Sequence, residues 1–488
     1  MTSDTLTTPP ALAPVTPPAR RLADLPGPRG LPVLGNALQI KPSRMHLQLE
    51  AWSRLYGPAF KVRVAKRTWL VVSDHEAVSS SLRDRPERFS RPSLGGRIAR
   101  EMGFDEGLFF ANDEVWKRQR RMVMAGFAPG HVKAYFPSLL TVTQRLQGRW
   151  RAAAESGTAI DLQADLMRFT VDVIAGLAFG AEVNTLESDD DVIQRHLNKI
   201  FPVLWNRVLA VWPRWRYLRL PADRALDRSV IEVKAAIGGF IAQARERLQA
   251  DPARREQPRN LLEAMIKAAD ESGSGLTDAD VAGNVFIMLL AGEDTTANTL
   301  AWMIYLLHQN PQAMARVRDE VRRVAPDAAQ FTPEQIGELE FIEACAHETM
   351  RLKPVAPLLA AQAVHATTLA GVDIPADTIV FTLMRHASVS EAHFPDPLAF
   401  RPERWINGEL PAQSASSAKR VSMPFGAGPR VCPGRYLALF EMKMALAMLL
   451  GSFDIESVAS PDGGEVREHL AFAMGPSGLR MRLRRRSS

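Results

Sequence analysis

The most specific pattern in this sequence of 488 residues is Phe425-Gly-Ala-Gly-Pro-Arg-Val-Cys-Pro-Gly434. Its cysteine, Cys432, stands before Pro433, and proline is favoured at the first position of a helix. A thiol at a helix N-terminus with Arg430 close by is expected to have a lowered pKa and to ionise readily. Such a thiolate acts as a nucleophile or as a metal ligand, whereas an isolated buried cysteine would only pack in the core.

A long helix is predicted upstream of this pattern, from Thr277 to about Gln309. Thr277 is the expected N-cap, with Asp280 three positions later, and Asn310-Pro311 should end the helix. At about 1.5 Å per residue the helix would span roughly 50 Å, so it must cross the core of a domain. Its middle nevertheless reads Ala291-Gly-Glu-Asp-Thr-Thr296, and acidic residues at core depth indicate a functional site.

The rest of the chain predicts a mainly α-helical protein with small β-sheets. Helical patterns dominate from about Val115 to Leu352. Short strands are predicted in Phe60–Ser73, in Ala360–Phe381 and in the alternating stretch GLRMRLRRR near the C-terminus. Residues 1–24 are rich in Thr and Pro and predict a disordered tail. No linker divides residues 25–488, which are therefore expected to form a single domain.

The composition excludes several classes of protein. The chain has 60 Lys+Arg and 54 Asp+Glu, a net charge of +6, but five arginines lie in the last nine residues. The body is therefore close to neutral, which does not predict a nucleic-acid partner. The two cysteines, Cys345 and Cys432, cannot form a disulfide scaffold or a four-cysteine metal site. The N-terminus carries no signal peptide and no apolar run reaches about 18 residues, so we expect a cytoplasmic protein without a membrane span.

Four shorter motifs also lie along the chain: Trp116-x-x-x-Arg120, Ala291–Thr296, Glu348-Thr-Met-Arg351 and Phe400-Arg-Pro-Glu-Arg-Trp405. Together with Phe425–Gly434 they resemble, in order, the haem-propionate contact, the oxygen-binding segment, the ExxR motif, the PERF segment and the haem-binding loop of the cytochrome P-450 family. The resemblance covers nearly the whole chain. It implies the cytochrome P-450 fold, a single large domain of helices and small sheets around a buried haem.

The resemblance implies that the cofactor is haem b and that Cys432 is the ligand of its iron. A thiolate ligand pushes electron density to the iron and favours cleavage of the O–O bond. Trp116 and Arg120 lie four positions apart, so one helical face can present both to a single haem propionate. The implied haem-binding residues are Trp116, Arg120, Ala291, Phe425, Arg430, Cys432 and Gly434.

Asp294 and Thr295 are the catalytic residues that the resemblance implies. The resemblance also implies that O2 is the co-substrate, and its use requires protons in an apolar pocket. The resemblance places Thr295 beside the oxygen and Asp294 in the route of proton delivery. A threonine inside a helix can also donate a hydrogen bond to the carbonyl four residues earlier, here that of Ala291.

The ExxR pair, Glu348 and Arg351, is implied to form a buried structural network with Arg404 rather than a solvated pair on a helix. Two positions depart from the family pattern. Trp405 stands in place of the usual phenylalanine, and Gln362 stands where many members carry an Arg or His for a propionate. The propionate clamp is therefore expected to be weaker or to be built differently.

The implied activity is that of a monooxygenase, which inserts one oxygen atom into an apolar organic substrate by hydroxylation or epoxidation. The alternatives are a haem-thiolate isomerase, a peroxide-driven enzyme and a non-enzymatic haem protein. Residues Phe201–Leu220, with tryptophans among arginines, could also touch a membrane surface. The implied substrate contacts, which could equally be core residues, are Phe104, Leu108, Phe109, Trp205, Trp212, Leu358 and Phe472.

An electron donor is the main expected partner of a monomeric protein. No flavin motif or cysteine cluster follows the haem-binding segment, so electrons are expected from a separate ferredoxin with its reductase or from a flavodoxin-type donor. A basic patch would steer such acidic donors, although the charges could equally be scattered and solvated. The residues expected to form this patch are Arg118, Arg121, Lys133, Arg435 and Lys443.

Overall fold

The computed structural model describes residues 19–127, 135–180, 183–188, 192–327, 330–406 and 418–486. Its α-helices are α1 (Met45–Tyr56), α2 (His75–Arg83), α3 (Ser93–Glu101), α4 (Asp113–Gly126), α6 (Phe136–Ser156), α7 (Leu162–Phe179), α8 (Val192–Leu209), α9 (Pro221–Ala250), α10 (Pro252–Glu256), α11 (Leu261–Asp270), α12 (Asp278–Gln309), α13 (Pro311–Val324), α14 (Pro333–Gly337), α15 (Glu340–Leu352) and α17 (Arg435–Ser452). Its strands are β1 (Arg20–Arg21), β2 (Ala59–Val64), β3 (Arg67–Val72), β4 (Phe89–Ser90), β5 (Ile160–Asp161), β6 (Leu358–Ala363), β7 (Thr367–Leu369), β8 (Val372–Ile374), β9 (Ile379–Leu383), β10 (Phe453–Ala459), β11 (Glu468–Leu470), β12 (Met474–Pro476) and β13 (Arg480–Arg485).

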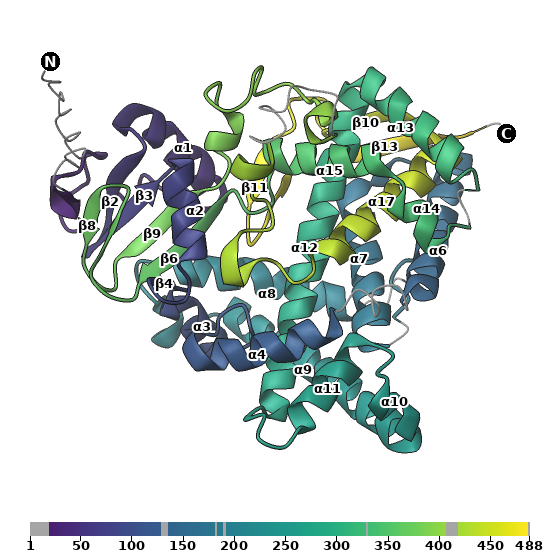
Figure 1. Cartoon of the computed structure of the whole chain (residues 1–488), viewed down its shortest axis with the longest axis horizontal. Helices are drawn as coiled ribbons and strands as arrows, with labels where there is room; N and C mark the ends of the chain where they lie inside the picture. The colour runs from purple at the N-terminus through teal and green to yellow at the C-terminus, as the bar shows by residue number, and fades with distance from the viewer. Residues whose placement is uncertain are drawn as a thin grey trace, which may run out of the picture.

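The predicted long helix is α12, and its capping residues explain its bounds. The hydroxyl of Thr277 accepts a hydrogen bond from the Asp280 amide at 3.3 Å, and the Asp280 carboxylate accepts one from the Thr277 amide at 2.8 Å. The helix ends at Gln309 because Asn310 precedes Pro311, whose ring disfavours helical angles at the residue before it. α12 crosses the middle of the molecule with other helices around it, as predicted (Figure 1).

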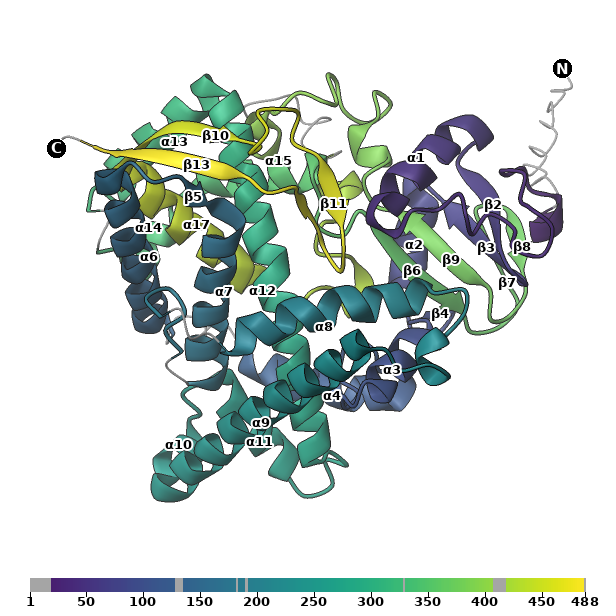
Figure 2. The same cartoon turned by 180° about the vertical axis from the view of Figure 1, so that it is seen from behind.

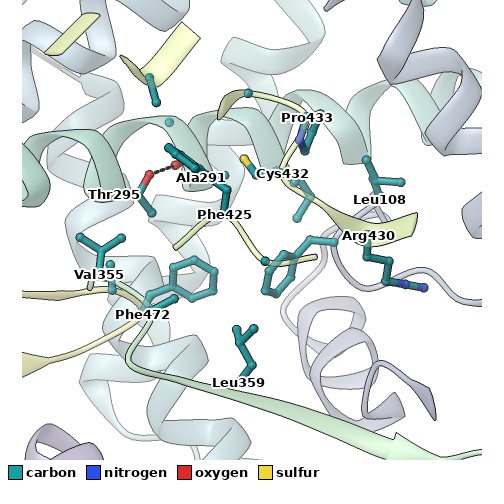
Figure 3. Close-up of a pocket in the computed structure, with 18 of the residues that line it drawn as sticks. Leu108, Ala291, Thr295, Val355, Leu359, Phe425, Arg430, Cys432, Pro433 and Phe472 are labelled. Carbon is teal, nitrogen blue, oxygen red and sulfur yellow. Dashed lines mark hydrogen bonds between the residues drawn. The ribbon is translucent and has the colours of Figure 1, made fainter. Parts of the chain in front are cut away.

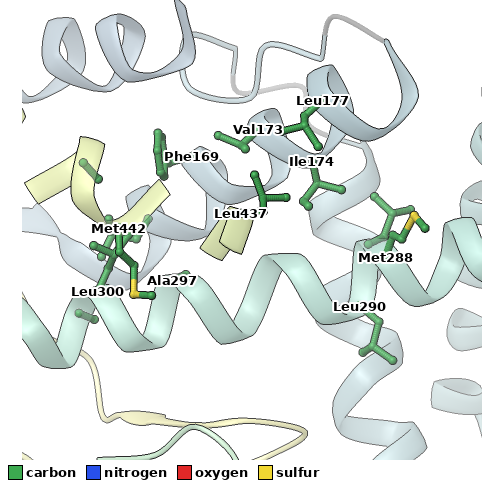
Figure 4. Close-up of a cluster of buried hydrophobic side chains, with 14 of the residues drawn as sticks. Phe169, Val173, Ile174, Leu177, Met288, Leu290, Ala297, Leu300, Leu437 and Met442 are labelled. Atoms are coloured by element: carbon green, nitrogen blue, oxygen red, sulfur yellow. The ribbon is translucent and has the colours of Figure 1, made fainter. Parts of the chain in front are cut away.

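The main hydrophobic core lies where α12 packs against α7 and α17 (Figure 4). Phe169 and Val173 of α7, Leu300 of α12 and Met442 of α17 are all buried there. Full burial of a side chain of this size contributes about 1.5–3 kcal/mol relative to exposure. The repeated contact along these helices therefore fixes the position of α12, which carries the AGEDTT segment.

A five-stranded sheet, in the order β2-β3-β9-β6-β4, lies to one side of the helices (Figures 1 and 2). Strands β2 and β3 form the hairpin predicted in Phe60–Ser73, with Ala59 opposite Val72. The predicted terminal strand is β13, which pairs with β10 and β5. A smaller hairpin, β11–β12, packs against α12.

The prediction of a disordered tail through residue 24 is wrong for residues 20–24. Arg20 and Arg21 form β1, which pairs in parallel with Val372 and Asp373 of β8, and a short 3-10 helix follows at Leu22–Asp24. The free edge of β8 supplies hydrogen-bond partners that local composition does not reveal. The part of the predicted tail before residue 19 lies outside the described residues.

The ExxR residues form the predicted buried network. The two carboxylate oxygens of Glu348 each accept a hydrogen bond from Arg351 at 2.8 Å, and Arg404 donates to the same carboxylate at 3.3 Å. Trp405 adds its indole N–H at 3.0 Å, so it is more than a substitute for phenylalanine. Arg351 also donates to the carbonyls of Ser388 and Pro397. The network therefore fixes the irregular segment that leads toward Cys432.

Among the helices of the described residues, none combines the length and the apolar character that crossing a membrane would require.

Candidate functional site

A cavity of about 460 Å³ lies between α12, α4, α8, β6 and the segment that carries Cys432 (Figure 3). Its lining is mostly apolar. Among the catalytic and haem-binding residues predicted from sequence, those that line it are Trp116, Arg120, Ala291, Thr295, Phe425, Arg430, Cys432 and Gly434. Asp294 does not line it. Residues separated by more than 300 positions along the chain thus meet at one site.

The Cys432 segment is held by a tight backbone arrangement. The Cys432 amide donates a hydrogen bond to the Phe425 carbonyl at 2.9 Å. Gly428 has a φ of +70°, and a Cβ there would lie 2.7 Å from the Arg83 Cα, so only glycine fits. The helix that follows, α17, begins at Arg435 with Gly434 as its N-cap, two residues later than the expected start at Pro433.

The prediction that the pKa of the Cys432 thiol is lowered is wrong for the protein chain alone. Burial raises this pKa, and it outweighs the opposing effects of the Gly434 amide and of the charges on Arg120 and Arg435. A thiolate at this position therefore needs a further positive charge, such as a metal ion, to be favoured. The described residues contain no cluster of His, Cys, Asp or Glu that could complete a metal site.

The cavity also contains a cluster of guanidinium groups that sequence reasoning found only in part. Arg85 and Arg91 line it beside the predicted Arg120 and Arg430. Within the described part of the chain, none of the four forms an ion pair, and buried nitrogens of Arg85, Arg91 and Arg430 have no hydrogen-bond partner. Of the described residues that line the cavity, Glu441 is the only acidic one. Buried cations without counter-ions are costly, so this cluster fits a ligand that carries carboxylates.

The lowered pKa values of these arginines reflect the free-energy cost of enclosing their charges without counter-ions. Burial, followed by the charges of Arg85 and Arg430, lowers the pKa of Arg91 well below its usual range. Burial lowers the pKa of Arg85 and of Arg430 to about 10 in each case. The two propionates of a haem would supply the missing negative charge, so thiol and arginine cluster together fit this group.

Arg430 and Trp116 are held in contact on the same side of the cavity. The Arg430 guanidinium donates to the Ala111 carbonyl at 2.6 Å and to the Asn112 side chain at 3.1 Å. Its central carbon lies 4.7 Å from the centre of the Trp116 ring. The contact leaves the Arg430 Nε without a described partner, available to an anionic ligand.

Sequence reasoning missed Arg85 and Arg91 because neither belongs to a recognised motif. The available signal is that each precedes a proline, Pro86 or Pro92, which favours extended backbone at the arginine. Gln362, at which the propionate clamp was expected to differ, lies on β6 and does not line the cavity. Its side chain instead accepts from the Ser93 amide and donates to Asp377.

Thr295 and Asp294 face different surroundings although they are neighbours on α12. The Thr295 hydroxyl lines the cavity and donates to the Ala291 carbonyl at 2.6 Å, as predicted (Figure 3). Asp294 accepts a hydrogen bond from Asn298 at 2.5 Å. Burial raises the pKa of Asp294, although the Ala473 amide and Asn298 oppose that effect. Because successive helical residues advance by about 100°, the Asp294 side chain leaves α12 in a different direction from that of Thr295.

Five of the seven predicted substrate contacts line the cavity: Leu108, Phe109, Trp205, Leu358 and Phe472. The other two do not. Phe104 stacks on Phe286 with ring centres 3.7 Å apart and belongs to the core. Trp212 is 64% exposed and stacks on Tyr217 in the connection between α8 and α9.

Comparisons with known proteins agree with this geometry. A family model described as Cytochrome P450 matches residues 25–482. A self-sufficient cytochrome P-450 monooxygenase of Aspergillus terreus is 28% identical over 94% of this chain and 43% of its own length. Cytochrome P-450 97B2 of Glycine max, a chloroplastic protein, is 26% identical over 91% of this chain and 84% of its own length.

One solved structure shows the same fold. The crystal structure of a mutant cytochrome P-450DA haem domain has a TM-score of 0.81 and 24% sequence identity, covering 95% of this chain and 98% of that one. The chain spans less than half the length of the self-sufficient relatives that it matches.

Replacing Arg91 with leucine should have opposite effects on the haem-free and the haem-bound protein. Removing a buried cation without a partner should raise the free energy of unfolding of the haem-free chain by about 1–3 kcal/mol. Loss of one charged hydrogen bond should speed transfer of haem to a scavenger protein about tenfold or more. Arg219→Leu, at an exposed arginine outside the cavity, is the matched control. Haem loss that is no faster in Arg91→Leu than in this control would contradict the assignment.

Proposed function

The chain belongs to the cytochrome P-450 family, and we propose that it is a haem-dependent monooxygenase that inserts one atom of O2 into an apolar organic substrate. The observation that carries this proposal is the convergence, on one apolar cavity, of a lone cysteine, a cluster of unpaired arginines and the threonine of α12. Each of these features alone has a structural explanation. Together they match the separate demands of a metal ligand, an anionic cofactor and a proton donor.

The residues that would hold the haem follow from the two charged parts of the cavity. Cys432 would ligate the iron, and Arg85, Arg91 and Arg430 would pair with the propionates. Trp116 would fix Arg430 through their ring contact. When bound, the haem supplies an iron centre that activates O2 with two electrons from a redox partner.

Thr295 and Asp294 would have separate roles in proton transfer. The Thr295 hydroxyl can turn from the Ala291 carbonyl toward the cavity and present its proton to the reacting O2. Asp294 would hold the next proton, because burial raises its pKa and keeps the acid form present at higher pH. Asp294 is fully protonated at pH values well below its raised pKa, and the protonated fraction falls as the pH rises through that pKa.

The cavity supports an apolar substrate of modest size. Its wall is formed by side chains such as Phe109, Leu204, Leu358 and Phe472, which offer contact area but no hydrogen bonds. Such a wall also excludes water, which limits the loss of electrons to side reactions. Cys432 must remain an unoxidised thiol to serve as a ligand, so a reducing compartment such as the cytoplasm suits the protein.

The electron donor would bind on the side where α4 meets the start of α17. Arg121 is exposed on α4, and Met124 and Tyr436 add exposed apolar surface. Arg435 lies at the N-terminus of α17 beside Tyr436. An acidic ferredoxin or flavodoxin-type protein complements this mixture of positive and apolar groups.

Two of the residues expected in the basic patch do not contribute to this side. Lys443 is 5% exposed and pairs with Glu343 at 2.7 Å, so its inclusion was wrong. The helical pattern of α17 turns this position toward α14 and α15, where Lys443 also donates to the Gly337 carbonyl. Lys133 lies outside the described residues.

The carbon monoxide difference spectrum of the reduced protein tests the assignment of the ligand. The wild type should show the red-shifted band of a thiolate-ligated haem, and Cys432→Ser should lose it because the alcohol is a far weaker ligand. Cys345→Ser, which alters the other, fully buried cysteine, should keep the band and is the matched control. Persistence of the band in Cys432→Ser would refute the proposed function.

Thr295→Ala should uncouple electron use from product formation. Without its hydroxyl the cavity loses a proton donor, so the fraction of NADPH converted to oxygenated product should fall about tenfold or more while peroxide release rises. Thr141→Ala removes the same kind of hydrogen bond, to Pro137, on the exposed face of α6 and should leave coupling unchanged. Full activity of wild type with peroxide alone and none with a reductase would instead favour the peroxide-driven alternative.

Reversing charge on the docking side should weaken use of an acidic donor. Arg121→Glu and Arg435→Glu should each raise the KM for a plant-type ferredoxin several-fold, and wild-type turnover at limiting ferredoxin should fall as ionic strength rises. Arg67→Glu, at an exposed arginine of the five-stranded sheet, is the control. A turnover rate that does not respond to salt would argue against this docking side.

A further inference from the structure

The β11–β12 hairpin reaches the cavity with its tip. Leu470, Phe472 and Ala473, in and around the turn, line the cavity (Figure 3). The Phe472 ring lies 5.6 Å from the Phe109 ring and 6.4 Å from the Phe201 ring, measured between centres. A substrate in the cavity would therefore touch this tip, and its shape would act on the position of the turn.

The base of the hairpin is anchored by a buried charge cluster whose residues do not themselves line the cavity. Glu468 of β11 accepts hydrogen bonds from His46 at 2.9 Å, from Lys353 at 2.6 Å and from Arg385 at 2.7 Å. Burial alone would raise the pKa of Glu468, but the His46 hydrogen bond and the charges of Arg385 and Lys353 lower it well below its usual range. Arg385 is tied in turn to Glu50 of α1 by two hydrogen bonds. The base is thus fixed by charged hydrogen bonds, whereas the tip is held mainly by the ring contacts of Phe472 and by the hydrogen bond from the Met474 amide to the Val355 carbonyl.

The second strand of the hairpin lies directly on the part of α12 that holds Asp294. A Cβ on Gly475 would come within 2.1 Å of the Asn298 side-chain oxygen, so this strand lies against the Asn298 side chain of α12 and leaves no room for a side chain at position 475. The Asn298 side-chain nitrogen donates to the Asp294 carboxylate at 2.5 Å. The Ala473 amide, at the tip, also stabilises the ionised form of Asp294. Two neighbours of the Asp294 carboxylate therefore depend on where the hairpin sits.

We propose that the β11–β12 hairpin is a positioning element that links substrate contact at Phe472 to the hydrogen bonding of Asp294, with Glu468 as its anchoring residue. A substrate that packs well on Phe472 holds the tip in place and keeps the Ala473 amide and Asn298 on Asp294. A poorly fitting substrate lets the tip move, which changes the proton affinity and orientation of the carboxyl group. This inference rests on the proposed monooxygenase function and adds a route by which substrate fit controls proton supply.

A double-mutant cycle separates this role from simple structural support. Gly475→Ala inserts a methyl group against Asn298 and should shift the pH dependence of coupling, measured as product formed per NADPH with naphthalene as the apolar probe. In the Asp294→Asn background the same methyl group should have no further effect on coupling. The effect of Gly475→Ala on coupling should differ at least about twofold between the two backgrounds, which is the lower end of the range for residues in contact. Equal effects of Gly475→Ala in both backgrounds would overturn the proposal.

Hydrogen exchange gives a readout that does not depend on turnover. Naphthalene should slow amide exchange in the peptide 468–476 of the wild-type holoprotein, and Phe472→Ala should abolish that slowing. Gly148→Ala, at a helical glycine of α6 with open space around it, is the control for the methyl group that Gly475→Ala adds in the double-mutant cycle. If naphthalene leaves the exchange of this peptide unchanged in wild type, the tip does not sense the cavity and the proposal fails.

Glu468→Gln tests the anchor. It keeps the size of the side chain but removes the charge that accepts hydrogen bonds from Lys353, Arg385 and His46, so it should speed exchange of the hairpin amides and weaken naphthalene binding while the carbon monoxide band stays unchanged. If this variant does not retain haem, the Gly475→Ala cycle still decides the proposal. A wild-type protein that shows the thiolate band but forms no oxygenated product would refute the proposed function, whereas the exchange experiment would still report on the hairpin.

Discussion

The rest of the site depends on one electrostatic constraint, the enclosure of four guanidinium groups, of which Arg85 is buried and Arg91, Arg120 and Arg430 are partly buried, around a cavity whose described lining includes a single acid. The chain alone does not neutralise these charges, and it also leaves the Cys432 thiol in its neutral form. Both costs are removed by the same kind of ligand, one that carries a metal ion at its centre and carboxylates at its edge. Cofactor binding and stability of the native state are therefore linked, because a ligand that binds only the folded chain stabilises it.

The helix α12 contacts the core, the cavity and the hairpin at once, because side chains along a helix point in different directions. Leu300 packs in the core with α7 and α17, Thr295 faces the cavity, and Asn298 meets the hairpin. This separation explains how an acid and a threonine that are adjacent in sequence can act from two environments. Asp294 does not line the cavity, and burial raises its pKa against the opposing effects of the Ala473 amide and Asn298.

Sequence predicted the features whose signals are local. The capping residues Thr277 and Asp280 placed the start of α12, and the spacing of Glu348 and Arg351 indicated their pairing. It did not predict features that depend on tertiary packing. The direction of the Cys432 pKa is decided by burial, and Lys443 proved to face the protein interior. Arg85 and Arg91 reach the cavity only because distant segments of the chain fold around it.

The hydrogen bond from Trp405 to Glu348 limits which residues can replace this tryptophan. A phenylalanine at this position has no N–H, so Trp405→Phe would remove one of the two donors to Glu348 Oε2 in the core of the ExxR network. The ring of His347, which stacks on Trp405 at 4.9 Å, would also lose part of its contact. Trp405 thus contacts α15 in two ways, through its N–H to Glu348 and through its ring face to His347, so a substitution here would weaken both contacts at once.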